Sequence, residues 1–206
     1  AAVGFPLGAA AAPPQLVAQT GHADFVEHFA FSPDGRYLAS GARDSEVKVW
    51  DLAEGLQLTT LRGGPGWIGG LVWTPGGRLV VVQPKSVTVF RPQTGEVVHK
   101  LDAPPTKNGG FLGYVGAVLV PRSEKVVLAR FDSLILLDTV SGTLKSVPVK
   151  SPPRHLAISS DGKLLAVGGQ AGDEMTRIYS VGSWKVLRSV EGDVREVAFS
   201  PDGRTL

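Results

Sequence analysis

The chain of 206 residues contains no cysteine, one methionine and four histidines. Without cysteine it can form no disulfide, no thiolate nucleophile and no cysteine-ligated zinc site. The histidines, His22, His28, His99 and His155, lack the spacing of metal ligands. The sequence therefore predicts neither a metal site nor a bound cofactor.

Helical periodicity and a charge excess of one sign are also missing. No stretch repeats its apolar residues at 3.6-residue intervals, and no GxxxxGK motif follows an apolar run to cradle phosphates. The net charge is only +2, with acids and bases interleaved, so there is no basic stripe for nucleic acid. No apolar run is long enough to span a membrane.

Glycine and proline, in contrast, are abundant. The 26 Gly and 15 Pro are spread along the chain rather than clustered. Many evenly spaced turns imply many short elements, which favours an all-β fold.

These turns form a repeat of about forty residues. The turn SPDG at 32–35 returns at 200–203, with TPGG at 74–77, PRSE at 121–124 and SSDG at 159–162 between them. Measured on one position of the turn, the steps are 42, 46, 39 and 41 residues, using Pro33, Pro75, Pro121, Ser160 and Pro201.

Short apolar runs surround each turn. In the first unit they are VEHFAFS, RYLASG, EVKVWDL and LQLTTL, and the next three units repeat the order. KVWDL and VTVF alternate with the period of a strand. Four short strands per forty-residue unit predict the antiparallel blades of a β-propeller, of which about four and a half are present.

The first unit resembles a WD40 repeat. It has GH at 21–22, then FAFSPDG, LASG, a turn aspartate at Asp44, and WD at 50–51; the fifth unit, EGDVREVAFSPDGRTL, is also similar. Units two to four are degenerate, with Phe90, Leu137 and Tyr179 where the Trp would be. The resemblance covers 15–206 and implies the first blades of a larger propeller, of roughly seven blades.

A His, a Ser and an Asp in one segment raise the question of a catalytic triad. The resemblance instead implies a structural tetrad, in which the Trp50 indole donates to Ser40, Ser40 meets His22, and Asp44 holds the other nitrogen of His22. A nucleophilic serine needs an exposed hydroxyl and an oxyanion site, and Ser40 lies mid-strand. We predict no catalytic residue and a tetrad that supports the fold.

The sequence also spells GxGxxG at 64–69, but the glycines lead into the strand LVW and no helix follows. We interpret the segment as a loop between blades.

In WD40 proteins, partner contacts concentrate at the start of the first strand of a blade and just before the turn aspartate. Counting back from each turn gives a predicted rim surface with aromatic and arginine anchors. Its members are Phe25, Glu27, Arg43, Trp67, Arg154 and Arg195. Trp73, in contrast, takes the apolar position of Phe31 and is expected in the core.

The first fourteen residues, AAVGFPLGAAAAPP, differ from the rest. They resemble the end of a secretory signal peptide, and the alternative is an Ala/Pro linker. With the phrasing QLVAQTGH they resemble bacterial exported WD40 proteins, which implies a periplasmic or secreted protein, with a cytoplasmic one as the alternative. The chain stops early in the fifth blade, so we expect a fragment whose open edge could self-associate.

Two function classes follow. The first is a non-catalytic scaffold that binds a protein or peptide on its top rim, as the sensing or targeting part of a larger protein. The alternative is a propeller enzyme, or a cofactor- or metal-binding propeller, with its site in the central channel. The first inner strands offer mostly Gly, Ala, Val and Phe, which favours the scaffold.

Overall fold

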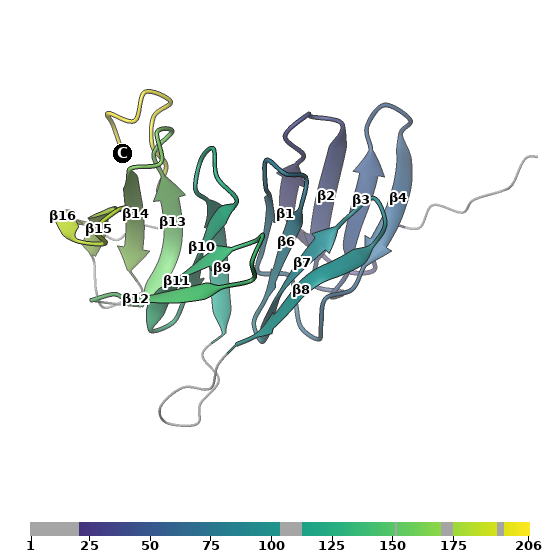
Figure 1. Ribbon diagram of the computed structural model, residues 1–206, viewed down its shortest axis with the longest axis horizontal. Helices are drawn as coiled ribbons and strands as arrows, with labels where there is room; N and C mark the ends of the chain where they lie inside the picture. The colour runs from purple at the N-terminus through teal and green to yellow at the C-terminus, as the bar shows by residue number, and fades with distance from the viewer. Residues whose placement is uncertain (1–20, 104–112, 151, 170–174, 193–195) are drawn as a thin grey trace, which may run out of the picture.

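The computed structural model describes residues 21–103, 113–150, 152–169, 175–192 and 196–206. These residues form four separate four-stranded antiparallel sheets, arranged side by side (Figure 1). In the described part there is no helix that could span a membrane. The predicted all-β architecture of four-stranded blades is confirmed.

Each sheet is one blade, and its strands are neighbours in sequence order. Blade 1 contains β1 (Val26–Phe31), β2 (Tyr37–Ala42), β3 (Val47–Asp51) and β4 (Leu56–Leu61). Blade 2 contains β5 (Gly70–Trp73), β6 (Leu79–Gln83), β7 (Ser86–Arg91) and β8 (Glu96–Asp102). Blade 3 contains β9 (Tyr114–Leu119), β10 (Lys125–Arg130), β11 (Ser133–Asp138) and β12 (Leu144–Pro148). Blade 4 contains β13 (Pro153–Ile158), β14 (Leu164–Gly169), β15 (Met175–Ser180) and β16 (Val186–Glu191).

The second and third strands of each blade carry the core. In β6 all five residues are buried, because neighbouring blades cover both faces of the sheet. A strand covered on both faces reads as a continuous apolar run rather than an alternating one, which explains LVVVQ. Three apolar clusters fill the spaces between blades 1 and 2, blades 2 and 3, and blades 3 and 4.

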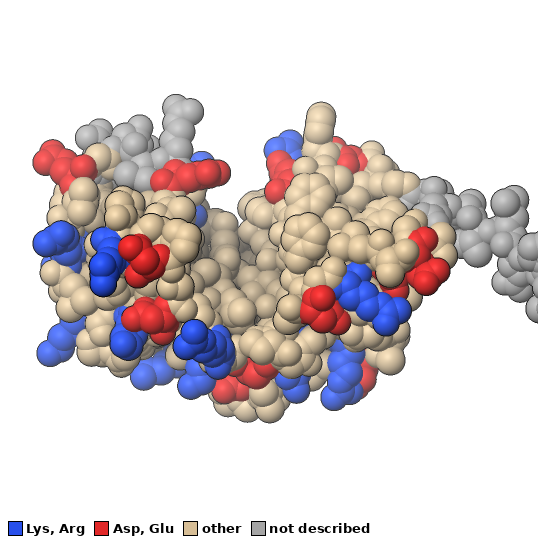
Figure 2. Space-filling view, turned by 90° about the horizontal axis from the view of Figure 1, so that it is seen from above, with Lys and Arg blue, Asp and Glu red and all other residues tan. Residues whose placement is uncertain are grey.

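The first strands of the blades, β1, β5, β9 and β13, are the inner strands and pack against one another in order. Seen from above, the blades form a crescent around a hollow whose visible walls carry few charges (Figure 2). Acidic and basic side chains alternate over the outer surface in this view.

The repeated turn has the same construction in blades 1 and 4 and in the segment after blade 4. The hydroxyl of Ser32, Ser159 or Ser200 donates to the aspartate two residues later, and the following glycine has a positive φ of 69–73°. Glycine is needed there because side chains disfavour that region. The residues 196–206 hold this turn and no strand.

Trp73 is buried, at 5% exposure, and its indole N–H donates to the carbonyl of Ala30 in blade 1 at 3.0 Å. The equivalent Phe31 is 64% exposed. Trp73 and Phe31 therefore differ in burial although they occupy the same position of the repeat. Trp73 has blade 1 beside it, whereas no described residue covers the ring of Phe31.

Candidate partner-binding surface

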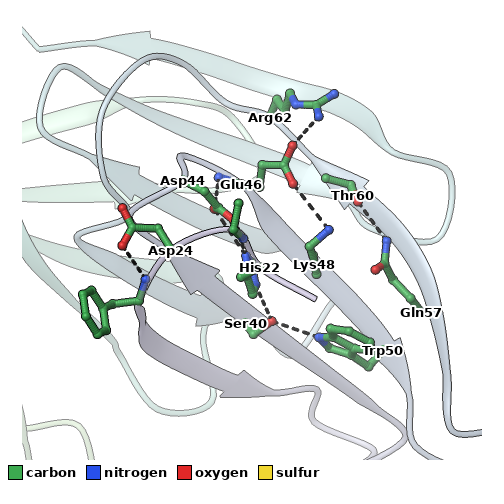
Figure 3. Close-up of polar contacts among 12 residues, drawn as sticks. His22, Asp24, Ser40, Asp44, Glu46, Lys48, Trp50, Gln57, Thr60 and Arg62 are labelled. Atoms are coloured by element: carbon green, nitrogen blue, oxygen red, sulfur yellow. Dashed lines mark hydrogen bonds and ion pairs between the residues drawn. The ribbon is translucent and has the colours of Figure 1, made fainter. Parts of the chain in front are cut away.

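His22, Ser40, Asp44 and Trp50 lie together in blade 1 (Figure 3). The indole Nε1–H of Trp50 donates to Ser40 Oγ at 2.9 Å. Ser40 Oγ lies 2.9 Å from His22 Nε2, and His22 Nδ1 lies 3.0 Å from Asp44 Oδ2. With the Nδ1–H tautomer, every polar atom in this row has a partner, since Ser40 then donates to Nε2.

Asp44 joins two pieces of backbone as well. Its carboxylate accepts the N–H groups of Ala23 and Glu46, at 2.9 and 3.0 Å. Burial raises the pKa of Asp44, but these hydrogen bonds and the one from His22 outweigh it, so the pKa lies below its ordinary value. The segment before β1 is thereby attached to the turn between β2 and β3.

Ser40 cannot serve as a nucleophile in this arrangement. The residue is only 4% exposed, and its hydroxyl is engaged by both the indole and the imidazole. A nucleophilic serine needs access for a substrate and donors for an oxyanion.

Four of the predicted rim residues lie around one groove of about 580 Å³, at the junction of blades 1 and 2. Glu27, Arg43 and Trp67 line it, together with Ser45 and Gly66. Phe25 lies at its edge, 75% exposed, with the guanidinium carbon of Arg43 5.9 Å from its ring centre. Arg43 also donates two hydrogen bonds to Glu27 Oε1, at 2.9 and 2.6 Å.

Trp67 stands between this groove and a second, larger cavity, because it lines both. Its side chain lies against Gly69, where an added Cβ would come within 2.9 Å of the indole. Trp67 is nevertheless 42% exposed, so part of its surface faces solvent.

The loop that carries Trp67 is held by a residue that the sequence analysis did not single out. Gln83 is fully buried, and its Nε2 donates to the carbonyls of Gly64 and Gly66 at 2.7 and 2.9 Å. A Cβ on Gly63 would come within 2.6 Å of Gln83 Oε1. The glycines of this loop are thus required by close packing, and no helix follows them as a dinucleotide site would need.

Arg154, the fifth predicted rim residue, is exposed on β13 and lines the second cavity rather than the groove. Arg195, the sixth, lies outside the described residues. Among the described residues, no group of three or more His, Asp or Glu side chains is placed to hold a metal ion.

Two histidines that the rim count missed, His28 and His155, line the second cavity. Each lies five residues before the turn position on which the repeat length was measured, Pro33 in blade 1 and Ser160 in blade 4. The same count that found Trp67 and Arg154 would therefore have found them, had it included that position.

Residues 14–51 match the model of the WD40 family, described as "WD domain, G-beta repeat". The matched segment spans the part of the chain that leads into blade 1 and its first three strands. The chain therefore contains a WD40 repeat.

Curated relatives resemble short parts of the chain. A "Lissencephaly-1 homolog" from Branchiostoma floridae is 46% identical over 44 residues, which are 21% of this chain and 11% of the relative. "Nuclear distribution protein PAC1-2" from Postia placenta is 36% identical over 77 residues, 28% of this chain and 18% of the relative. "Ribosome assembly protein 4" from Saccharomyces cerevisiae is 44% identical over 45 residues, 22% and 9%. These organisms are eukaryotes, so the bacterial and exported character stays a prediction.

The fold has a solved counterpart. The β-propeller domain of Myceliophteria thermophila Cps50 (Swd1) superposes with a TM-score of 0.74 at 21% identity. The comparison covers 93% of this chain and 63% of that one. The likeness establishes the propeller fold of the blades.

Proposed function

We propose that this chain, a run of β-propeller blades of which the first is a WD40 repeat, is a non-catalytic scaffold that binds a protein or peptide. The binding surface is the groove between blades 1 and 2, with Phe25, Arg43 and Trp67 as its anchors. The observation that carries the proposal is that residues from three separate segments of the sequence meet around one groove.

The chemistry of the groove suits a protein partner. Aromatic and arginine side chains are enriched among the anchors of protein interfaces. Aromatic rings bury a large area for few rotatable bonds, and the arginine guanidinium donates several hydrogen bonds from one plane. Trp67 and Phe25 are 42% and 75% exposed, so each has apolar surface to bury when a partner binds. Arg43 is held over Phe25 by Glu27, so little of its freedom is lost when a partner arrives.

The matched segments make up 9–18% of the curated relatives' length. We further propose that the scaffold acts as the sensing or targeting part of a larger protein. The alternative is an enzyme with its site in the central channel. Ser40, which is buried and engaged by the tetrad, is not available to such a site as a nucleophile.

The test is a capture experiment with the double variant Trp67→Ala, Arg43→Ala. We expect the variant to fail to capture proteins that the unaltered chain captures. The melting temperature of the variant should differ from that of the unaltered chain by no more than a few degrees. The matched control is Leu187→Ala, Arg188→Ala, which also removes one exposed apolar and one exposed basic side chain, from β16 in blade 4. Equal retention by the groove variant and the control would contradict the proposal.

A further inference from the structure

One position of each repeat faces the second cavity, which has a volume of about 690 Å³. The position lies five residues before the turn position on which the repeat length was measured. It falls on the four inner strands and in the segment after blade 4. It is occupied by His28, Gly70, Gly116, His155 and Glu196, all of which line the cavity. The cavity is therefore the mouth of the channel between the inner strands.

The two histidines have matching surroundings on blades 1 and 4. Each follows an irregularity in strand pairing, between Val26 and His28 in one blade and between Pro153 and His155 in the other. Each is paired with a glycine on the next strand, Gly41 or Gly168. A bulge at the end of a strand re-aims the side chain that follows it.

The intervening blades leave space between these imidazoles. Blades 2 and 3 place Gly70 and Gly116 at the same position, where a side chain would otherwise fill the channel mouth. Neither imidazole has a hydrogen-bond partner among the described residues. Both rings are therefore free to form hydrogen bonds with water or with a ligand.

The described lining of the cavity carries one cation, Arg154, and one carboxylate, Glu196, so the lining becomes positively charged when the two rings are protonated. Arg154 is exposed in the same cavity, and its positive charge contributes to the lowered pKa of His155, after burial, while Glu196 acts in the opposite direction. Burial also lowers the pKa of His28, against the neighbouring Glu27. Glu27 forms an ion pair with Arg43 and does not line this cavity among the described residues.

We propose that this channel mouth binds an acidic segment of the protein partner, with two or more carboxylates, and binds it more tightly as the pH falls. Arg154 supplies the permanent charge, and His28 and His155 each donate to a carboxylate once protonated. The rings are on blades 1 and 4, with two blades between them, so one carboxylate does not serve both. Trp67 and Phe131 line the same cavity and would contact an apolar residue between the two acidic ones.

This inference rests on the proposed function only in taking the ligand to be part of a protein. The pH dependence follows from linkage: a ligand that prefers the imidazolium form raises the pKa of each ring, and its affinity rises as the pH falls. The effect ends where the ligand carboxylates themselves take up protons, near pH 4.

The experiment uses the 206-residue chain and the peptide acetyl-Glu-Leu-Glu-amide, with acetyl-Gln-Leu-Gln-amide as the uncharged control. The chain has four histidines, so four imidazole signals can be followed by NMR during a pH titration. We expect the acidic peptide to shift His28 and His155 and to raise the pH at which they titrate. Adding the peptide at a fixed pH should leave the signals of His22 and His99 unchanged, so these two serve as internal references.

The affinity for the acidic peptide should be about tenfold higher at pH 5.5 than at pH 7.5, since each imidazolium gains a charge-assisted hydrogen bond. Arg154→Gln should weaken binding about tenfold at both pH values. His28→Gln, His155→Gln should remove the pH dependence and leave the residual affinity at pH 7.5.

Three results would overturn the inference: no shift of either histidine, equal binding of the glutamine peptide, or an equal effect of inorganic phosphate. The last would show a simple anion site. None of these three results would contradict the scaffold proposal. That proposal is tested separately, at pH 7.5, by the loss of partner capture in the Trp67 and Arg43 variant.

Discussion

Replacing His22 by alanine is the sharpest test of the tetrad. The side chain of His22 is only 4% exposed, and the substitution removes its contacts with Ser40 and with the carboxylate of Asp44. A hydrogen bond to a charged group contributes about 1.5–3 kcal/mol and a neutral one about 0.5–1.5 kcal/mol. We therefore expect His22→Ala to lower the free energy of unfolding by about 2–4 kcal/mol.

For a domain of this size, each kcal/mol shifts the melting temperature by roughly 2–4 °C. The expected loss is therefore about 4–16 °C, measured by differential scanning calorimetry or circular dichroism. The matched control is His99→Ala, which removes a histidine with one hydrogen bond, from Nε2 to the carbonyl of Val140, near the surface. That variant should lose no more than about 1 kcal/mol.

A double-mutant cycle isolates the contact itself. His22→Ala and Ser40→Ala remove the two partners separately, and residues in one hydrogen-bond network couple by about 0.5–3 kcal/mol. A coupling near zero, or a melting temperature of His22→Ala equal to that of His99→Ala, would refute the structural role of the tetrad.

Two further predictions concern the loop anchor Gln83 and the effect of pH on stability. Gln83→Glu keeps the shape of the side chain but directs a carboxylate at the carbonyls of Gly64 and Gly66. The variant should therefore be less stable by about 2–4 kcal/mol at pH 7. A chemical denaturation curve equal to that of the unaltered chain would contradict the role of Gln83 as an anchor. His28 and His155 have pKa values below the ordinary 6.5, so the unfolded chain binds protons that the folded chain does not. The free energy of unfolding should therefore fall as the pH drops below about 6.5. The double variant His28→Gln, His155→Gln should show a smaller fall over the same pH range.

The repeat itself made the fold predictable. One turn, spaced at about forty residues, marks each blade whether or not the blade carries a WD dipeptide, and short apolar runs fix its strands. Blades 2 to 4 have Phe90, Leu137 and Tyr179 where blade 1 has Trp50, and all three are nearly or fully buried. None of the three carries an indole N–H, so none needs the serine partner that Trp50 has in blade 1.

Contacts between blades were less predictable. The exposure of Phe31 and the burial of Trp73 differ although the two share one position of the repeat, because burial depends on what the neighbouring blade supplies. Gln83 was missed for a related reason: its partners are backbone carbonyls of a loop, which no side-chain motif marks. The rim positions were found by a count along the chain, but that count could not separate the groove, which Arg43 lines, from the channel mouth, which Arg154 lines.

The tetrad and Gln83 hold equivalent parts of adjacent blades by different chemistry. In blade 1, Asp44 and His22 attach the segment before β1, which leads into Phe25. In blade 2, Gln83 attaches the loop before β5, which leads into Trp67. These two segments carry the proposed aromatic anchors on either side of the groove, so both anchors start from backbone that hydrogen bonds hold in place. Under the proposed function, a surface held in this way would lose little conformational entropy on binding, and the fold-supporting residues of blades 1 and 2 would assist recognition without touching the partner.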